Sequence, residues 1–417
     1  MTLFSILKKV TLCLMAISYP LLFFGQEDHL LLNQVIQIQE VEREYHLFLP
    51  DLTEDPPVVI LVHGFGDNFN DVIGIDSSGL ALEEGAFPYR VWLDIAEEEN
   101  IILVIPNGTP VGGQLGWNDC RGGDIGNPEE DDLAFIASLL DLVLTTYNAD
   151  RNRVYATGAS NGGQMCIRLA QEIPEKIAAI ASISASNAAN SECAESAIPI
   201  PALFINGTED PLLPYEGGQM VGGRGEVFSV EQTVAYWVQR NSADSIPEVM
   251  SIEDINVNDG CTATKFSYKN QDNETVVVLF EMLNGGHASP SIIHRYGFPL
   301  VPFGLGNQNG DIEMAPEVWD FFKDKLNVGL SSSTTLLGPA SGQVNVYPNP
   351  ARDIIMIDVE GLTSTLTAAS LFNSSGQLVK RYENLSQPLH VPEIPSGMYF
   401  LRMESKEGVM FQKMLKE

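Results

Sequence analysis

A short strand that runs directly into a glycine-flanked serine constrains this 417-residue chain more than any other feature. Residues 153–163 read RVYATGASNGG, in which β-branched and aromatic residues precede Gly158-Ala159-Ser160-Asn161-Gly162 and a helix-compatible stretch follows. In a G-x-S-x-G motif a strained turn lifts the serine hydroxyl above a sheet. Both glycines are needed because a side chain there would collide with the strand or helix that the turn brings close. The alternative is a glycine-rich turn of a nucleotide-binding fold.

A second strand and turn precede this motif. Val58 to Val62 is an unbroken apolar run, typical of a buried parallel strand, and His63-Gly64-Phe65-Gly66-Asp67 follows it at once. In serine hydrolases such a turn commonly supplies one N–H of an oxyanion hole, and the residue after the nucleophile supplies the other. We therefore expect the backbone amides of Phe65 and Asn161 to form the oxyanion hole, with the ring of His63 supporting the turn.

Two segments downstream supply an acid and a histidine. Residues 201–205 predict an apolar strand that ends shortly before Asp210, and residues 276–282 predict another that leads to His287. The order Ser160, Asp210, His287 is the serine–acid–histidine order of α/β-hydrolases. The chemistry needs all three residues, because an imidazole must take the proton of the serine and a carboxylate must hold that imidazole in the right tautomer.

Each of the two partners has a rival. Asp210 is preferred to Glu209 because the residue before a proline, here Pro211, is held extended, which fixes its carboxylate. His287 is preferred to His294 because it directly follows a Gly-Gly turn at a strand end. His294 lies in an apolar stretch and is expected to be a packed or surface histidine.

Six stretches of the chain resemble a known family. They read LVHGFGDN, GWNDCRGG, DDLAFIASLLDLVLTTYNADRNRVYATGASNGGQM, INGTEDPLLPYEGG, NGGHASP and GNQNGDIEMAPEVWDFF. Residues 30 to 326 thereby resemble the secreted esterases that group poly(3-hydroxybutyrate) depolymerase-like proteins with feruloyl and acetyl-xylan esterases. The resemblance implies an α/β-hydrolase fold, with a mostly parallel sheet flanked by helices. It also implies ester hydrolysis through Ser160, Asp210 and His287 without a cofactor.

The same resemblance bears on the substrate cleft. It implies that Trp117 and Asn118 line the cleft, while the alternative for Trp117 is a core anchor under a long loop. One stretch departs from the family pattern. Where such proteins often read Gly-Gly-Gly-His-Thr-Trp-Pro, residues 284–290 of this chain read NGGHASP. The missing tryptophan leaves the leaving-group side of the pocket, and therefore the identity of the ester, open.

The N-terminal segment predicts export. Residues 1–25 carry two lysines and then an interrupted apolar run, which is typical of a signal peptide cleaved near Gly25-Gln26. An uncleaved membrane anchor is the alternative. No other apolar stretch approaches the roughly 20 residues that cross a bilayer, so the mature chain is expected to be soluble, with no transmembrane segment.

The chain changes character after the catalytic region, residues 26–329. An uncharged linker of small residues, 330–342, leads to residues 343–417, whose short alternating strands and turns predict a small all-β sandwich. Its stretches VNVYPNPARD, LFNSSGQLV and IPSGMYFLRM resemble the C-terminal sorting domain of type IX secretion, while a carbohydrate-binding module is the alternative. The resemblance implies a secreted or cell-surface location, the type IX machinery as a partner and no part in catalysis.

The charge of the chain restricts its substrates. The formal net charge is −32 at pH 7, which opposes binding to nucleic acid or anionic membranes and repels polyanionic substrates. Neutral esters, carried by a polymer or oligomer, are therefore expected. The acidic run Glu129–Asp132 precedes a predicted helix over 133–146, and acids in a first helical turn explain it better than a metal site. No metal is expected.

Four cysteines remain after signal removal, and export permits disulfides. Cys120, Cys166, Cys193 and Cys261 allow three full pairings. Cys166 lies on the helix after the nucleophile and is expected to be a buried free thiol. No spacing resembles a zinc site.

These features together predict a secreted serine esterase that acts on neutral esters through an acyl-enzyme. Feruloyl or acetyl esters of plant polysaccharide are favoured, because no binding domain for a solid polymer is evident beyond the C-terminal region. A polyhydroxybutyrate-type polyester is the alternative substrate. A surface-binding protein with an inactive hydrolase fold would have no need of an intact Ser160, Asp210 and His287. A serine peptidase would usually carry a propeller or cap domain, and no such repeat is present.

Overall fold

The computed structural model describes most of the catalytic region and much of the C-terminal region. It covers residues 29–327 apart from 39–40, 52–54, 83–84, 122–126 and 298–299, and then 343–347, 350–360, 366–373, 378–382, 385, 388–391, 394–405 and 409–416. The predicted signal peptide and linker lie outside the described residues, so the domain boundaries stay predictions. Within the described ranges, every helix is too short or too polar to cross a membrane.

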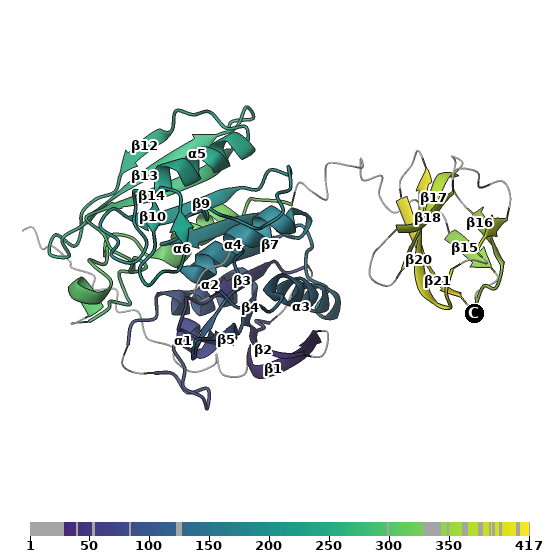
Figure 1. Ribbon diagram of the computed structural model, residues 1–417, viewed down its shortest axis with the longest axis horizontal. Coiled ribbons are helices and arrows are strands. Elements are labelled where there is room, and N and C mark those ends of the chain that lie inside the picture. The colour runs from purple at the N-terminus through teal and green to yellow at the C-terminus, as the bar shows by residue number, and fades with distance from the viewer. Residues whose placement is uncertain are drawn as a thin grey trace, which may run out of the picture.

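A ten-stranded mixed sheet lies at the centre of the catalytic region (Figure 1). Its strands are β1 Leu30–Ile38, β2 Val41–Phe48, β3 Val58–Val62, β4 Ile102–Pro106, β7 Val154–Ala159, β8 Ala179–Ile183, β9 Ala202–Gly207, β12 Glu248–Ser251, β13 Thr262–Lys269 and β14 Thr275–Leu283. They lie in the order β1-β2-β4-β3-β7-β8-β9-β14-β13-β12. The neighbours from β4 to β14 pair in parallel, and the strands at both edges pair antiparallel.

Helices cover both faces of this sheet. They are α1 Phe69–Ile73, α2 Val91–Glu99, α3 Asp132–Thr146, α4 Asn161–Glu172, α5 Val230–Arg240 and α6 Met314–Phe322. Alternate residues of β3 enter two separate cores: Val58, Ile60 and Val62 join the core under α3, α4 and α5, while Val59 and Leu61 join the core under α1, α2 and α6. A strand buried on both faces explains why this run is continuously apolar.

The predicted elements correspond to observed ones. The runs at 58–62, 201–205 and 276–282 form β3, β9 and β14, and the helix expected over 133–146 is α3. The prediction of an α/β-hydrolase fold is confirmed. Because β3, β7, β9 and β14 are parallel, the turns that follow them meet at one edge of the sheet.

Shorter elements fill the connections between these strands and helices. Two small hairpins pair β5 Thr109–Val111 with β6 Gln114–Gly116, and β10 Gly218–Gln219 with β11 Glu226–Val227. Short helical segments are η2 Pro88–Arg90, η3 Pro174–Lys176 and η4 Leu300–Gly304. The β5–β6 hairpin lies next to the predicted oxyanion turn, since the amide of Gly66 donates to the carbonyl of Leu115 at 2.8 Å.

The C-terminal region is all β. Its strands are β15 Gln343–Tyr347, β16 Ile354–Glu360, β17 Leu366–Asn373, β18 Leu378–Tyr382, β19 Leu389–His390, β20 Gly397–Ser405 and β21 Val409–Lys416. One antiparallel sheet has the order β15-β16-β19 and the other β18-β17-β20-β21. Ile355 from the first sheet shares a core with Leu371 and Leu401 from the second. The predicted small all-β region is therefore confirmed.

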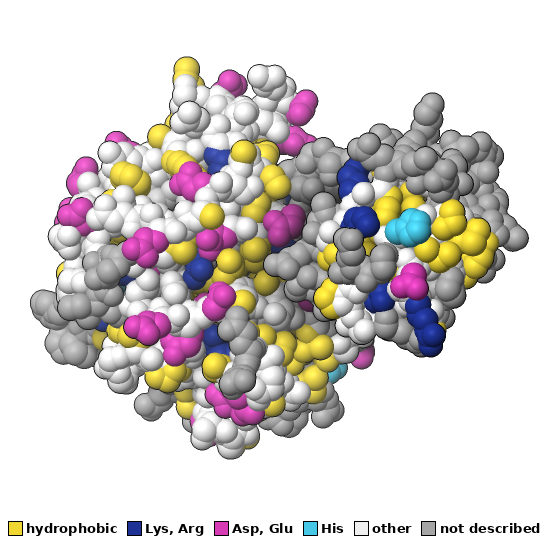
Figure 2. Space-filling view, turned by 45° about the vertical axis from the view of Figure 1, so that its right-hand side comes forward, with side chains coloured by type: hydrophobic (Ala, Val, Ile, Leu, Met, Phe, Trp, Pro, Cys, Tyr) yellow, Lys and Arg dark blue, Asp and Glu magenta, His cyan; other side chains and the backbone are white. Residues whose placement is uncertain are grey.

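The charge divides between the two regions. Figure 2 shows acidic side chains spread over the visible face of the catalytic region. In the sequence, residues 343–417 carry seven basic and eight acidic side chains, a net charge of −1, whereas the whole chain carries −32. The charge that opposes polyanionic substrates therefore belongs to the catalytic region.

Candidate active site

The predicted nucleophile lies in a strained turn. β7 ends at Ala159 and α4 begins at Asn161, so Ser160 alone makes the turn. Its backbone has φ 55° and ψ −123°, a conformation that non-glycine residues rarely adopt and that functional sites retain. The amide of Ser160 donates to the carbonyl of Ile183 in β8 at 2.8 Å, which ties the turn to the neighbouring strand.

The two flanking glycines permit this turn. A Cβ on Gly158 would lie 2.6 Å from the carbonyl oxygen of Val62, and one on Gly162 would lie 2.3 Å from the same oxygen. Neither contact is possible for a real side chain, because the end of β3 and the first turn of α4 cross here in direct backbone contact. The predicted steric role of both glycines is confirmed.

The predicted acid and histidine are hydrogen-bonded to each other. The Nδ1 of His287 lies 2.6 Å from the Oδ2 of Asp210. The other oxygen of Asp210 accepts the amides of Leu212 and Leu213 at 2.8 and 2.9 Å. This carboxylate is 2% exposed, whereas the rival Glu209 is exposed to solvent. With Nδ1 bound to the acid, Nε2 is the nitrogen of His287 left for proton transfer.

The loops that carry this pair are joined through their backbones. The amide of Glu209 donates to the carbonyl of Gly285 at 2.9 Å. A Cβ on Gly207 would lie 2.3 Å from that carbonyl oxygen, and one on Gly286 would lie 2.0 Å from the carbonyl oxygen of Leu305. Gly207 at the end of β9 and Gly286 before the histidine therefore let three chain segments meet without side chains between them.

His63 supports the turn after β3 as a buried neutral ring. The amide of Gly108 donates to Nε2 at 2.9 Å, so Nδ1 carries the proton and donates to the carbonyl of Gly64 at 2.7 Å. Burial lowers the pKa of His63 to about 4. The ring fixes the backbone that leads to Phe65, as the sequence predicted. Both of its nitrogens are already hydrogen-bonded, so neither is free to accept the proton of Ser160.

The backbone N–H of Asn161 precedes the first hydrogen bond of α4, and the side chain of Asn161 is held in place by hydrogen bonds. Its amide is the first of α4, and the helix makes its first backbone bond from Gln164 to the carbonyl of Ser160. Its side-chain oxygen accepts the amide of Trp117 at 2.7 Å, and its nitrogen donates to the Oδ2 of Asp119 at 2.6 Å. The amide is thus held at the helix terminus beside Ser160, where an oxyanion donor is expected.

Trp117 does not line a cleft. Its indole is 0% exposed, belongs to the core under α3, α4 and α5, and donates to the carbonyl of His63 at 2.9 Å. Of the two alternatives for this residue, the geometry matches the core anchor. Asn118 is partly buried, and its amide donates to Asp132 at 2.6 Å while its side chain donates to the carbonyl of Glu130 at 3.3 Å.

A buried ion pair under the oxyanion turn was not identified from sequence. The Nε of Arg121 lies 2.7 and 2.9 Å from the two oxygens of Asp119, and both side chains are almost completely buried. Asp119 also accepts from Asn161, so the pair supports the start of α4. Both residues stand in the stretch GWNDCRGG that carried the family resemblance, but their pairing depends on the tertiary structure.

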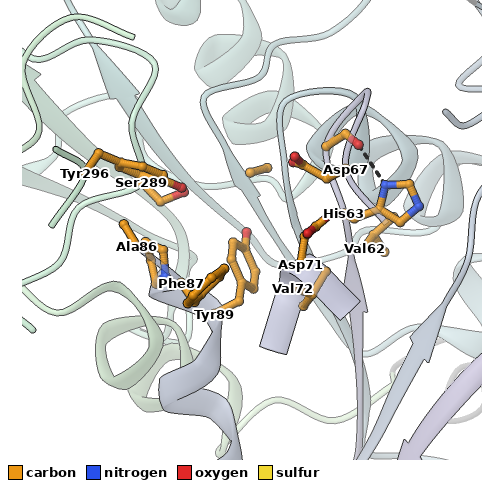
Figure 3. Close-up of a pocket in the computed structure, with 13 residues that line it drawn as sticks. Val62, His63, Asp67, Asp71, Val72, Ala86, Phe87, Tyr89, Ser289 and Tyr296 are labelled. Carbon is orange, nitrogen blue, oxygen red and sulfur yellow. Dashed lines mark hydrogen bonds between the residues drawn. The ribbon is translucent and has the colours of Figure 1, made fainter. Parts of the chain in front are cut away.

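A cavity of about 210 Å³ opens beside the nucleophile turn. In Figure 3, Ser289 and Tyr296 lie on one side of it and Asp67 and Asp71 on the other, with Tyr89 between them. Asp67 reaches the surface, while its Oδ2 lies against Gly64. Withdrawal of this carboxylate from bulk water and the charge of Asp71 raise the pKa of Asp67 to about 6, and His287 acts in the opposite direction. Sequence patterns alone did not single out these five residues.

The acidic run and the cysteines have structural roles. Asp131 caps α3 by accepting the amide of Ala134 at 3.0 Å, and Asp132 is buried against Arg43 at 2.6 Å. These contacts explain the run as helix capping and ion pairing. In the described ranges, one group of three possible metal ligands lies close together: the ligand atoms of Cys120, Glu172 and Cys193 are within 4.8 Å of one another. The two cysteines form a disulfide, and Cys166 and Cys261 are buried free thiols, as predicted for Cys166.

Two family models match the sequence of this chain. A family model for putative esterases matches residues 38–256, more than half of the chain. The chain belongs to this esterase family. A second model, for the C-terminal sorting domain of a secretion system, matches residues 345–417. The sorting domain indicates type IX secretion of the esterase, to the cell surface or the medium.

Individual relatives of the esterase are distant. A probable feruloyl esterase C of Aspergillus terreus is 26% identical over 291 residues, which cover 67% of this chain and 83% of that protein. A bifunctional acetylxylan esterase/xylanase, XynS20E of Neocallimastix patriciarum, is 26% identical over 186 residues. The match covers 44% of this chain but only 24% of the length of XynS20E. The solved acetyl xylan esterase from Aspergillus awamori is 14% identical, with a TM-score of 0.41, over 70% of this chain and 98% of its own.

Proposed function

We propose that this esterase hydrolyses neutral carboxylic esters through an acyl-enzyme on Ser160. The observation that carries the proposal is the hydrogen bond between His287 and the buried Asp210, set at the same sheet edge as the strained turn of Ser160. A serine hydroxyl needs this combination, because a neutral imidazole held by a carboxylate takes its proton during attack.

The proposed reaction has two halves. In the first, Ser160 attacks the ester carbonyl while Nε2 of His287 accepts its proton, and the imidazolium then protonates the departing alcohol. In the second, His287 removes a proton from water, which attacks the acyl-enzyme and releases the acid. Asp210 stabilises the imidazolium in both halves, and its two amide donors hold the carboxylate in its orientation.

The proposed oxyanion hole consists of the amides of Phe65 and Asn161. Support for Asn161 comes from its place as the first residue of α4 and from its anchored side chain. Support for Phe65 comes from the buried ring of His63 and from the bond between Gly66 and Leu115, which hold the turn on either side. Each such donor commonly contributes about 3 kcal/mol to the transition state.

Feruloyl and acetyl esters of plant polysaccharide are the substrates we favour. The feruloyl and acetylxylan esterases among the relatives support this choice, and so does an acidic surface that suits neutral polymers. A polyhydroxybutyrate-type polyester remains the second candidate, because it presents a neutral carbonyl to the same residues. Trp117 is not part of the proposed cleft, since its indole is buried.

A panel of esters tests the proposal. The wild-type protein and Ser160→Ala are compared on p-nitrophenyl acetate, methyl ferulate, acetylated xylan and a polyhydroxybutyrate film. We expect turnover of ferulate or xylan that Ser160→Ala abolishes without a change in melting temperature. Clearing of the film alone would make the polyester the substrate. Activity of Ser160→Ala within a few-fold of wild type would contradict the nucleophile, and a folded wild type inactive on every ester would favour a binding protein.

A further inference from the structure

The cavity beside Ser160 is lined by groups of two kinds. Val72, Phe87 and Pro88 give it apolar walls, while the carboxylates of Asp67 and Asp71 face the hydroxyl-bearing residues Ser289 and Tyr296 across it (Figure 3). A ligand with a flat or apolar body and polar substituents would satisfy both kinds of surface.

The cavity lies next to the reacting atoms. A Cβ on Gly64 would lie 3.8 Å from the Cβ of Ser160 and 3.0 Å from the Oδ2 of Asp67, so the nucleophile and this carboxylate flank one glycine. Asp67 is also near enough to His287 for their charges to attract each other. Ala159, the residue before the nucleophile, forms part of the wall. A group bound here would therefore belong to the ester being cleaved.

Hydrogen-bond acceptors outnumber donors in this cavity. Its lining contains no lysine or arginine among the described residues, so the two carboxylates face it without a fixed cation. One oxygen of Asp71 already accepts from the amide and the side chain of Asn68, at 3.0 and 2.6 Å. An ionised carboxylate only accepts hydrogen bonds, so a neutral occupant must supply donors.

A buried hydroxyl at the floor provides independent evidence for a polar ligand. Tyr89 is 8% exposed, and its ring points into the space between Asp71 and Ser289 (Figure 3). Its hydroxyl lies near that of Thr157, yet neither has a hydrogen-bond partner of ordinary geometry within the described residues. A buried hydroxyl without a partner costs about 1–3 kcal/mol, which a bound polar group would relieve.

We propose that this cavity is the subsite for a neutral ring that bears hydroxyl groups, which donate hydrogen bonds to Asp67 and Asp71. The volume of about 210 Å³ supports a single ring, because a cavity of about 150 Å³ holds benzene. The ring belongs either to a phenolic acyl group of the ester or to a sugar in its alcohol part. This inference rests on the proposed esterase function and names the substrate contacts that give it specificity.

Matched substrate pairs test the subsite. In the phenol arm, methyl ferulate is compared with methyl 3,4-dimethoxycinnamate, which differs by methylation of the phenol hydroxyl. In the sugar arm, an acetylated methyl xyloside is compared with its O-methylated analogue. In at least one arm, wild type should prefer the hydroxylated ester in kcat/KM by about 10- to 100-fold, the range of a hydrogen bond to a charged group. The arm that responds identifies the source of the ring.

Variants then assign the preference to the cavity. Asp67→Leu and Tyr89→Phe should each reduce the ratio of the two kcat/KM values several-fold toward one, while Asp272→Asn, at an exposed turn, should leave the ratio unchanged. The ratio cancels any general effect of Asp67 on His287. Tyr89→Phe removes only the hydroxyl that lies near Thr157 and keeps the ring, so it keeps the test valid if Asp67→Leu folds poorly.

The outcomes separate this inference from the proposed function. If the wild-type protein shows no hydrolysis of p-nitrophenyl acetate that depends on Ser160, the esterase assignment itself is wrong. If that hydrolysis is intact but wild type shows no hydroxyl preference in either arm, the subsite is overturned alone. A preference for an ester with a quaternary ammonium group over both hydroxylated esters, lost in Asp67→Leu, would also overturn it.

Discussion

Asp210 and Glu209 are adjacent acids with different surroundings. Asp210 binds His287 and two backbone amides, whereas Glu209 is exposed and contributes its backbone to the histidine loop. The rule that the residue before a proline is held extended pointed to Asp210 from sequence, and the geometry agrees with that preference. The same reasoning could not place Trp117, because a tryptophan in a long loop has the same pattern whether it lines a cleft or fills a core.

Substitution at these two acids tests the role of the carboxylate. Asp210→Asn should lower kcat for p-nitrophenyl acetate by about 10⁴-fold, since an amide at this position favours the wrong tautomer of His287. Glu209→Gln, the matched control, should change kcat less than two- to three-fold, about 0.5 kcal/mol. The reverse result, with Glu209→Gln inactive and Asp210→Asn active, would show that the acid has been misassigned.

Asp67 should destabilise the folded protein above its pKa. The pKa is raised from 3.8 to about 6, so between these values the folded state holds a proton that the unfolded chain has released. Stability from this group is therefore lost as the pH rises from about 4 through 6. Asp67→Asn should melt about 1–2 °C above wild type at pH 8, with the difference shrinking toward pH 4. A melting temperature at pH 8 equal to or below that of wild type would contradict this environment for Asp67.

At the scale of elements, the turn between β7 and α4 was the most predictable feature of the fold. Its geometry is determined within a few residues, because Gly158 and Gly162 are adjacent to the serine that they accommodate. The pairing of Asp119 with Arg121 and Asn161, and the cavity between α1 and the loop after His287, could not be predicted in this way. They arise where segments far apart in sequence pack together, and no local pattern records that contact.

Gly162→Ala tests how closely β3 and α4 cross. The added Cβ would lie 2.3 Å from the carbonyl oxygen of Val62, so the elements must separate, at about 3 kcal/mol or more. We expect a lower midpoint of urea unfolding together with a loss of esterase activity. The control is Gly297→Ala, where a Cβ meets no atom within 4 Å of the described residues. Equal stability of the two variants would argue against this crossing.

At the scale of the whole molecule, one covalent bond joins the loop that leads to α3 with the segment between β8 and β9. The disulfide Cys120–Cys193 closes a loop of 73 residues next to the Asp119–Arg121 pair. Export makes such a bond permissible, and the sorting domain at residues 345–417 supports export. The sequence left three pairings open, because cysteine spacing does not reveal which segments meet.

Removal of this disulfide should destabilise the catalytic region without altering its chemistry. In the chain-entropy model a loop of this length contributes about 4 kcal/mol, so Cys120→Ser/Cys193→Ser should lower the melting temperature by roughly 5–10 °C. Reductant should lower the melting temperature of wild type by a similar amount and leave the double variant unchanged. A variant as stable as wild type would mean that this bond does not form in the secreted protein.

Covalent trapping of the nucleophile tests the central claim most directly. The intact protein is treated with a fluorophosphonate, which reacts with activated serines, and the labelled peptide is located by mass spectrometry. We predict one adduct, on Ser160, formed much more slowly in Asp210→Asn and absent in Ser160→Ala. An adduct on a different residue, or a folded wild-type protein that forms none, would contradict the account.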